Sequence, residues 1–271
     1  MALTITMTKS AERINLESSI KAAHKRALST ATNMLGNEYD GNLKKALEDQ
    51  DFISRMHNAV AVEWVGYVNG YRELEALEAK EGYPAMNEAV RVLDNIASFL
   101  PESVKGECYY PFSGVDFYWL RIFDKVVFQD IGFYQEEEVP NMWWDVDTYS
   151  DARINDIVST LKSQDIIDES QKPFRVTGDA EKPEIIPEYN CATNTLLMKG
   201  GHDVLDFLEN RYPSIPLNFG AIVIGTPANP FMEVAERLSY DGYNWAGSSK
   251  GTDYLIPYSM ELEDLNVFVK E

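Results

Sequence analysis

The stretch ECYYPFSGVDFYWLRIFDKVVFQD, residues 107–130, decides the fold. It contains two short apolar runs, Glu107–Phe112 and Lys125–Phe128, which we predict to be β-strands. Ser113-Gly114 follows the first run, and Asp130 follows the second. This pattern is typical of a nucleotide site, because glycine lets the backbone approach a ligand and an acid accepts hydrogen bonds from ribose hydroxyls. The alternative is a hairpin or a buried strand pair that ends in polar residues.

The spacing within this stretch is close to that of a dinucleotide-binding fingerprint. Gly114 and Asp130 lie 16 positions apart (130 − 114), near the roughly 20 residues that separate the glycine turn from the ribose-binding acid. Only one glycine stands where G-x-G-x-x-G would supply three, so the spacing matches the fingerprint in part.

Length and composition indicate a globular protein. The chain has 271 residues, of which 45% are hydrophobic and 12% aromatic, enough to bury a sizeable core. No apolar run approaches the roughly 20 residues that span a bilayer, and the N-terminus has no secretory pattern. We therefore expect a soluble, cytoplasmic protein that is not bound to a membrane.

The charge is strongly negative and unevenly distributed. Residues 1–106 carry 15 acids and 12 bases, and residues 107–271 carry 29 and 12, which gives net charges of −3 and −17. Such a field repels nucleic-acid phosphates and attracts cations, so we expect a small-molecule substrate and no nucleic acid. Two cysteines and three scattered histidines form no metal-binding motif, and both thiols are expected to be free and buried.

The first hundred residues are predicted to be all-helical. Three segments, 10–35, 43–79 and 85–99, repeat apolar residues at three and four positions. In the first segment the apolar residues near one face are Ile14, Ile20, Leu28 and Leu35. We expect residues 1–105 to form an N-terminal helical domain that acts as a lid or as the interface of a homodimer.

From Gly106 onward, β-rich runs alternate with helices. After the two strands of the opening stretch we predict five more, at Phe174–Val176, Asn194–Met198, Phe219–Ile224, Tyr254–Pro257 and Asn266–Val269. Helices are predicted at 150–163, 202–210 and 230–239. This alternation indicates an α/β fold, a Rossmann-like, seven-stranded, mostly parallel sheet with helices on both faces, over residues 106–271. Ligands of such sheets bind at the carboxyl ends of the strands. We expect the strand-end turns to converge on that edge, namely Ser113-Gly114, Gln129-Asp130, Gly178-Asp179 and Lys199-Gly200.

On this order of elements, residues 106–271 resemble the class I S-adenosylmethionine-dependent methyltransferases. The resemblance implies that S-adenosyl-L-methionine is the cosubstrate, with Ser113-Gly114 facing its amino-acid part and Asp130 binding the ribose hydroxyls. Ile131 would pack on the adenine, and the acid after the third strand, in Gly178-Asp179-Ala180, would meet the adenine amino group. The sequence YPFSGVD departs from the glycine-rich motif of the family, and no N-P-P-Y follows the fourth strand.

Further candidates lie near the strand ends. Asp116 either caps the following helix, which the sequence favours, or receives the ammonium group of the cosubstrate. Lys199, in the turn after the fourth strand, is grouped with the cofactor-binding residues. His202, in the same region, is a candidate base, and Tyr134 is a candidate aromatic wall around a cation, as are Tyr109 and Tyr110, of which one is expected to be core.

Several functions remain open. Methyl transfer to a small molecule is the leading hypothesis. A helical domain before a glycine-poor core also resembles nicotianamine synthase, which implies aminocarboxypropyl transfer or cyclisation with release of methylthioadenosine. An NAD-dependent Rossmann enzyme and a non-catalytic binding protein are the further alternatives.

Overall fold

The computed structural model describes residues 9–42, 45–46, 48–130, 150–177, 186–199, 207, 216–225, 231–257 and 264–271. Its helices are α1 (Ala11–Tyr39), α3 (Gln50–Glu81), α4 (Pro84–Phe99), η1 (Glu102–Val104), η2 (Phe117–Arg121), α5 (Asp151–Ser163), α6 (Ile186–Tyr189) and α8 (Phe231–Tyr240). Its strands are β1 (Glu107–Pro111), β2 (Lys125–Asp130), β3 (Phe174–Thr177), β4 (Asn194–Met198), β5 (Ala221–Gly225), β6 (Tyr243–Ser249) and β7 (Leu265–Lys270).

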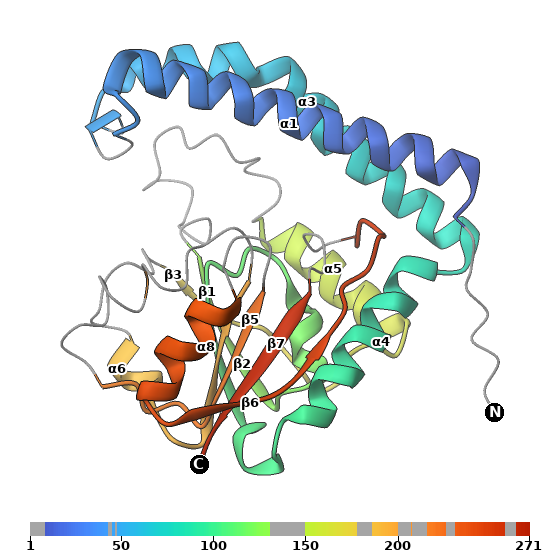
Figure 1. The fold of residues 1–271 in the computed structure, drawn as a ribbon. Coiled ribbons are helices and arrows are strands. Elements are labelled where there is room, and N and C mark those ends of the chain that lie inside the picture. The colour runs from blue at the N-terminus through green and yellow to red at the C-terminus, as the bar shows by residue number, and fades with distance from the viewer. Residues whose placement is uncertain are drawn as a thin grey trace. The chain divides into compact units, whose positions relative to one another are not determined.

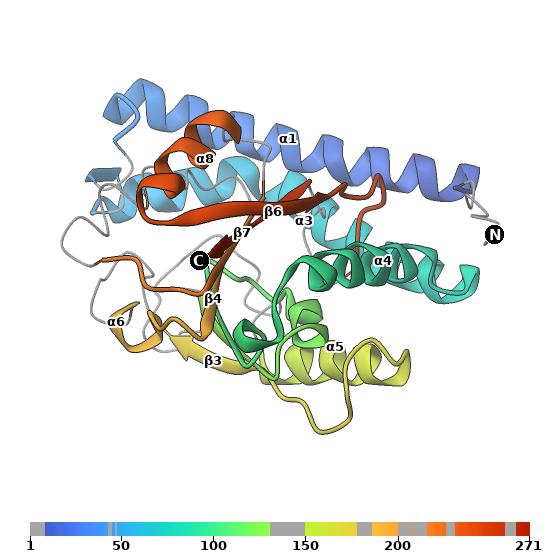
Figure 2. The ribbon, with the colours of Figure 1, turned by 60° about the horizontal axis from the view of Figure 1, so that its bottom comes forward.

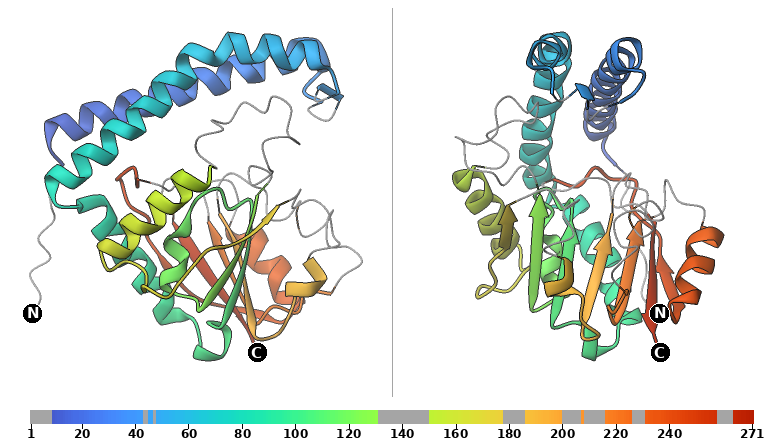
Figure 3. Two further views of the ribbon diagram at one scale, coloured as in Figure 1. Left: turned by 180° about the vertical axis from the view of Figure 1, so that it is seen from behind. Right: turned by 90° about the vertical axis from the view of Figure 1, so that its left-hand side faces the viewer.

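The described chain forms two compact units. The first ends at Pro84, and the second begins at Ala85. The first contains the long helices α1 and α3, which lie side by side (Figure 1 and Figure 3). The second contains the sheet together with α4. The helix α4 therefore belongs to the sheet-containing unit, although it precedes the switch from helical to alternating sequence at residue 106.

Small residues let α1 and α3 approach closely. The buried residues of α1 include Ile20, Ala23 and Ala27, and a Cβ atom added at Gly70 of α3 would lie only 2.5 Å from Ile20. The apolar face predicted for α1 is wrong in part, because Ile14 is 49% exposed and Leu28 is 43% exposed. Alanine lines the contact instead, since larger side chains would hold the two helices apart.

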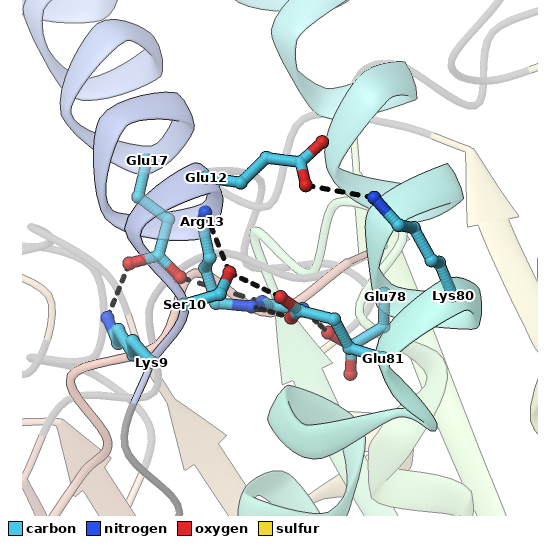
Figure 4. A network of polar contacts seen from close by, with 8 residues as sticks. All are labelled: Lys9, Ser10, Glu12, Arg13, Glu17, Glu78, Lys80 and Glu81. Carbon is cyan, nitrogen blue, oxygen red and sulfur yellow. Dashed lines mark hydrogen bonds and ion pairs between the residues drawn. The ribbon is translucent and has the colours of Figure 1, made fainter.

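A buried arginine, Arg13, connects the start of α1 to the end of α3 through ion pairs (Figure 4). The Arg13 side chain is fully buried and donates hydrogen bonds to Glu78 and, at 2.7 Å, to Glu81. Glu17 lies 3.6 Å from the same guanidinium and pairs with Lys9. The planar guanidinium suits several carboxylates at once, which explains how a charge is accommodated in this helix contact.

The second unit is built on a seven-stranded sheet in the order β3-β2-β1-β4-β5-β7-β6. Neighbouring strands from β3 to β5 are parallel, and β7 runs antiparallel to both β5 and β6. Figure 1 and Figure 2 show α4 and α5 on one side of the sheet and α6 and α8 on the other. This is the predicted α/β, Rossmann-like, mostly parallel arrangement, and its order reverses between β1 and β4, the switch point at which ligands of such sheets bind.

The sixth strand lies where the sequence did not predict it. Tyr254–Pro257 was expected to be a strand, but it forms none; its apolar side chains are buried, and Tyr118 donates its hydroxyl hydrogen to the Pro257 carbonyl at 2.9 Å. The strand is Tyr243–Ser249 instead. Only its two ends and Gly247 are buried, so it lacks the apolar run by which the buried strands were recognised.

Two further expectations concern single features. Cys108 is buried with a free thiol as expected, whereas Cys191 is exposed, because it follows α6 in a surface turn. None of the helices within the described ranges is both long enough and apolar enough to cross a membrane. The predicted helix at 202–210 lies outside the described residues, apart from Phe207.

Candidate functional site

The turn after β1 is held against the end of β2. Its backbone has a positive φ at Phe112 (57°) and again at Gly114 (54°), a conformation that glycine adopts freely and phenylalanine rarely does. The Gly114 N–H donates to Oδ2 of Asp130 at 2.9 Å, and the Ser113 N–H donates to the Gln129 carbonyl at 3.2 Å. The predicted convergence of these two strand ends is therefore confirmed, and Asp130 fixes the position of the glycine turn.

Asp116 lies just beyond this turn, and one of its carboxylate oxygens accepts hydrogen bonds from three donors. Its Oδ2 accepts from Lys199 Nζ at 2.7 Å, from Trp119 Nε1 at 3.1 Å and from the Tyr110 hydroxyl at 3.3 Å. The capping role favoured by the sequence is wrong, because Asp116 makes no side-chain hydrogen bond to the backbone of η2. The carboxylate is turned instead toward the end of β4, where Lys199 follows the strand.

The Asp116–Lys199 pair is withdrawn from water. The side chains are 4% and 2% exposed, respectively, so each charge depends on the other for compensation. The second oxygen of Asp116, Oδ1, is also buried and has no hydrogen-bond partner among the residues that the structure describes. A buried carboxylate oxygen without a donor is costly, and this oxygen has the chemistry to accept a hydrogen bond from an N–H or O–H group.

The two tyrosines of β1 point to opposite faces of the sheet, and both are buried. Tyr109 donates its hydroxyl hydrogen to the Gln129 side chain and stacks on Tyr189 with ring centroids 5.4 Å apart; burial raises the pKa of its hydroxyl. Tyr110 reaches Asp116. Tyr109 is thus a core residue, and Tyr110 belongs to the polar cluster.

The structure brings together six of the residues selected from the sequence, namely Tyr110, Ser113, Gly114, Asp116, Asp130 and Lys199. The sequence analysis did not identify Trp119 as a site residue. Its position three residues after Asp116 could have indicated the contact, because residues three apart on a helical turn lie on the same face. The remaining candidates lie outside the described residues: Ile131, Tyr134, Gly178, Asp179, Ala180 and His202.

Comparison with solved structures finds likenesses to other chains, among them the distant one given below. No protein-family model and no curated protein matches the chain. A solved structure from Pyrococcus horikoshii, provisionally described as an RNA methyltransferase, aligns with 68% of this chain and 84% of its own at 15% sequence identity and a TM-score of 0.39. A likeness at this level carries no conclusion about what the present chain binds or does.

Proposed function

We propose that this protein is an S-adenosylmethionine-dependent transferase that acts on a small molecule, with methyl transfer as its reaction. The observation that carries the proposal is Asp116 Oδ1, which is buried without a hydrogen-bond partner in the described part of the chain. It lies at the switch point of a sheet with the strand order of class I methyltransferases. S-adenosylmethionine would supply a sulfonium-activated carbon to an incoming nucleophile. The chain would need to hold this cosubstrate, align the acceptor and exclude water.

The described residues fit such a cosubstrate at its amino-acid end. An ammonium group requires an acceptor, and Asp116 Oδ1 is one that no other described residue satisfies. Lys199 balances the charge of Asp116 from the other oxygen, so a single ammonium there would share the carboxylate with an existing cation. The turn holds Phe112 at a positive φ, a strained conformation for phenylalanine, and the hydrogen bond from Gly114 to Asp130 keeps the turn in place.

The choice of a small acceptor rests on charge. Residues 107–271 carry 29 acids and 12 bases, a surplus that disfavours a polyanionic acceptor such as RNA. Transfer of a methyl group to RNA at a rate above that to small molecules would overturn this part of the proposal while leaving the cosubstrate assignment intact.

The test compares cosubstrate affinity in three variants by calorimetry. Asp116→Asn should weaken binding about 10- to 100-fold, since a hydrogen bond to a charged group contributes roughly 1.5–3 kcal/mol. Asp130→Ala should weaken it by about 1–3 kcal/mol by releasing the turn. The matched control is Asp124→Asn, an exposed acid between η2 and β2, which should bind as the parent does. Equal affinity in all four proteins, each shown to be folded, would refute the site.

The nucleotide product identifies the group transferred. Methyl transfer releases S-adenosylhomocysteine, whereas aminocarboxypropyl transfer or cyclisation releases methylthioadenosine. Mass spectrometry of the reaction mixture separates the two, and methylthioadenosine as the enzymatic product would replace methyl transfer with the second reaction.

A further inference from the structure

The two oxygens of the Asp116 carboxylate have very different surroundings. Lys199 Nζ, Trp119 Nε1 and the Tyr110 hydroxyl lie 2.7, 3.1 and 3.3 Å from Oδ2. A carboxylate oxygen offers about two lone pairs, so three donors already exceed what Oδ2 accepts well. The other oxygen, Oδ1, is buried and has no hydrogen-bond partner within the described residues. A further donor, such as the ammonium group of a ligand, is therefore best accepted at Oδ1.

Burial holds the three donors in place, but they differ in how firmly they direct a hydrogen bond. Trp119 is fully buried, and Tyr110 and Lys199 are nearly so. The two aromatic rings pack edge-on, with centroids 6.4 Å apart. The indole has a single N–H group, whose direction is fixed by the ring, whereas a lysine ammonium can rotate its three N–H groups. Lys199 therefore supplies charge, and Trp119 supplies direction.

The plane of the Asp116 carboxylate needs such a directional contact. The χ2 torsion of aspartate has broad preferences, so an unrestrained carboxylate turns over a wide range of angles. The contacts from Trp119 and Tyr110 come from two different elements, η2 and β1, and together they restrict this rotation. Because the orientation is set before a ligand arrives, less ordering is needed when the ligand binds.

We propose that Trp119 is a positioning residue for the cosubstrate, which together with Tyr110 turns Asp116 Oδ1 toward the ammonium group. This role rests on the proposed function, since it requires a ligand whose amino group reaches this oxygen. It also determines specificity. A ligand with an amino group at this point is selected over an otherwise similar ligand without one, because only the former uses the oriented oxygen.

The alternative is that Trp119 serves only the fold. The side chain fills a fully buried position, so its replacement would then lower the free energy of unfolding and weaken every ligand of the site alike. A positioning role predicts another pattern, in which the contribution of the amino-acid arm is lost and that of the nucleoside is kept. Ligand discrimination therefore separates the two roles, and stability alone does not.

Calorimetric titration of the full chain with two probes tests the positioning role. S-adenosylmethionine carries the ammonium group, and methylthioadenosine has the nucleoside and the sulfur without the amino-acid arm. Trp119→Phe should weaken the binding of S-adenosylmethionine about three- to tenfold and keep that of methylthioadenosine within about twofold of the parent. Equal weakening of both probes would show a structural role and overturn the proposal.

Two tyrosine variants repeat the comparison with the removal of a single hydroxyl group. Tyr110→Phe should weaken S-adenosylmethionine binding about two- to fivefold, less than Trp119→Phe does, because 3.3 Å is long for an O–H···O bond. The matched control is Tyr109→Phe, which removes a buried hydroxyl that donates to the Gln129 side chain instead. It should bind both probes as the parent does. Equal losses in the two tyrosine variants would contradict a path through Asp116.

A double variant shows whether Trp119 acts through Asp116. In Asp116→Asn the amide oxygen should turn to the three donors, which leaves no acceptor for the ammonium group. Adding Trp119→Phe should then change the affinity for S-adenosylmethionine by less than about twofold. Multiplication of the two single losses would mean that Trp119 acts independently, and would overturn the proposal.

The same series separates failure of the positioning role from failure of the proposed function. If Asp116→Asn binds S-adenosylmethionine as tightly as the parent, the cosubstrate site itself is refuted. If Asp116→Asn binds weakly while Trp119→Phe and Tyr110→Phe bind as the parent does, only the positioning role is refuted. Circular dichroism of each variant shows that it is folded.

Discussion

Replacement of Lys199 by methionine should destabilise the protein markedly, because it leaves the Asp116 carboxylate buried without its cation. The two charged atoms are 2.7 Å apart, which corresponds to a gross attraction of about 6 kcal/mol at an effective dielectric constant of about 20. Much of this offsets desolvation, so the net loss on removing one partner is about 3–5 kcal/mol. Lys199→Met should therefore lower the free energy of unfolding by that amount, measured by urea denaturation.

The control for this experiment is an exposed pair of similar length. Lys105 lies 2.6 Å from Glu102, whose side chain is 89% exposed, and Lys105→Met should cost less than about 1 kcal/mol. The double variant Lys199→Met/Asp116→Asn should recover part of the loss, since the stranded charge is removed while an acceptor remains for Trp119. A loss for Lys199→Met no larger than that for Lys105→Met would refute the burial of this ion pair.

Three further predictions concern stability. Arg13→Met should lower the free energy of unfolding by about 3–5 kcal/mol by stranding the carboxylates of α3, measured by urea denaturation. Gly220→Ala should cost about 1–3 kcal/mol in thermal unfolding, because its Cβ would lie 2.1 Å from the Ala192 carbonyl oxygen, whereas Gly106→Ala meets nothing within 4 Å and serves as control. Burial lowers the pKa of His57, so as the pH falls the unfolded chain binds a proton at this residue before the folded protein does. The free energy of unfolding therefore decreases as the pH drops below about 6.5. His57→Gln should reduce this decrease, measured as unfolding over a series of pH values.

The buried strands of the sheet could be predicted from the sequence because their apolar runs are continuous. Asn194–Met198 was predicted with its observed bounds, and each other parallel strand was found to within two residues at either end. The edge strand β6 could not be predicted in this way, since most of its side chains are exposed and it contains glycine and serine. Tyr254–Pro257 shows the converse error, in which apolar side chains are buried without forming a strand.

Part of the site was also accessible from sequence. The proximity of Gly114 and Asp130 followed from their positions after two neighbouring parallel strands, and the structure confirms it. The Asp116–Lys199 ion pair did not follow, because its members are 83 residues apart and only the strand order brings them together. Which oxygen of Asp116 is left without a donor depends on side-chain packing, which no sequence pattern specifies.

The measurement that tests the central claim most directly is calorimetric titration of the purified parent protein with S-adenosylmethionine. We predict saturable binding of one molecule per chain, weakened in Asp116→Asn and retained in Asp124→Asn. Absence of binding heat at several temperatures, in a protein shown to be folded, would contradict the proposed cosubstrate and leave the Rossmann-like fold without this function.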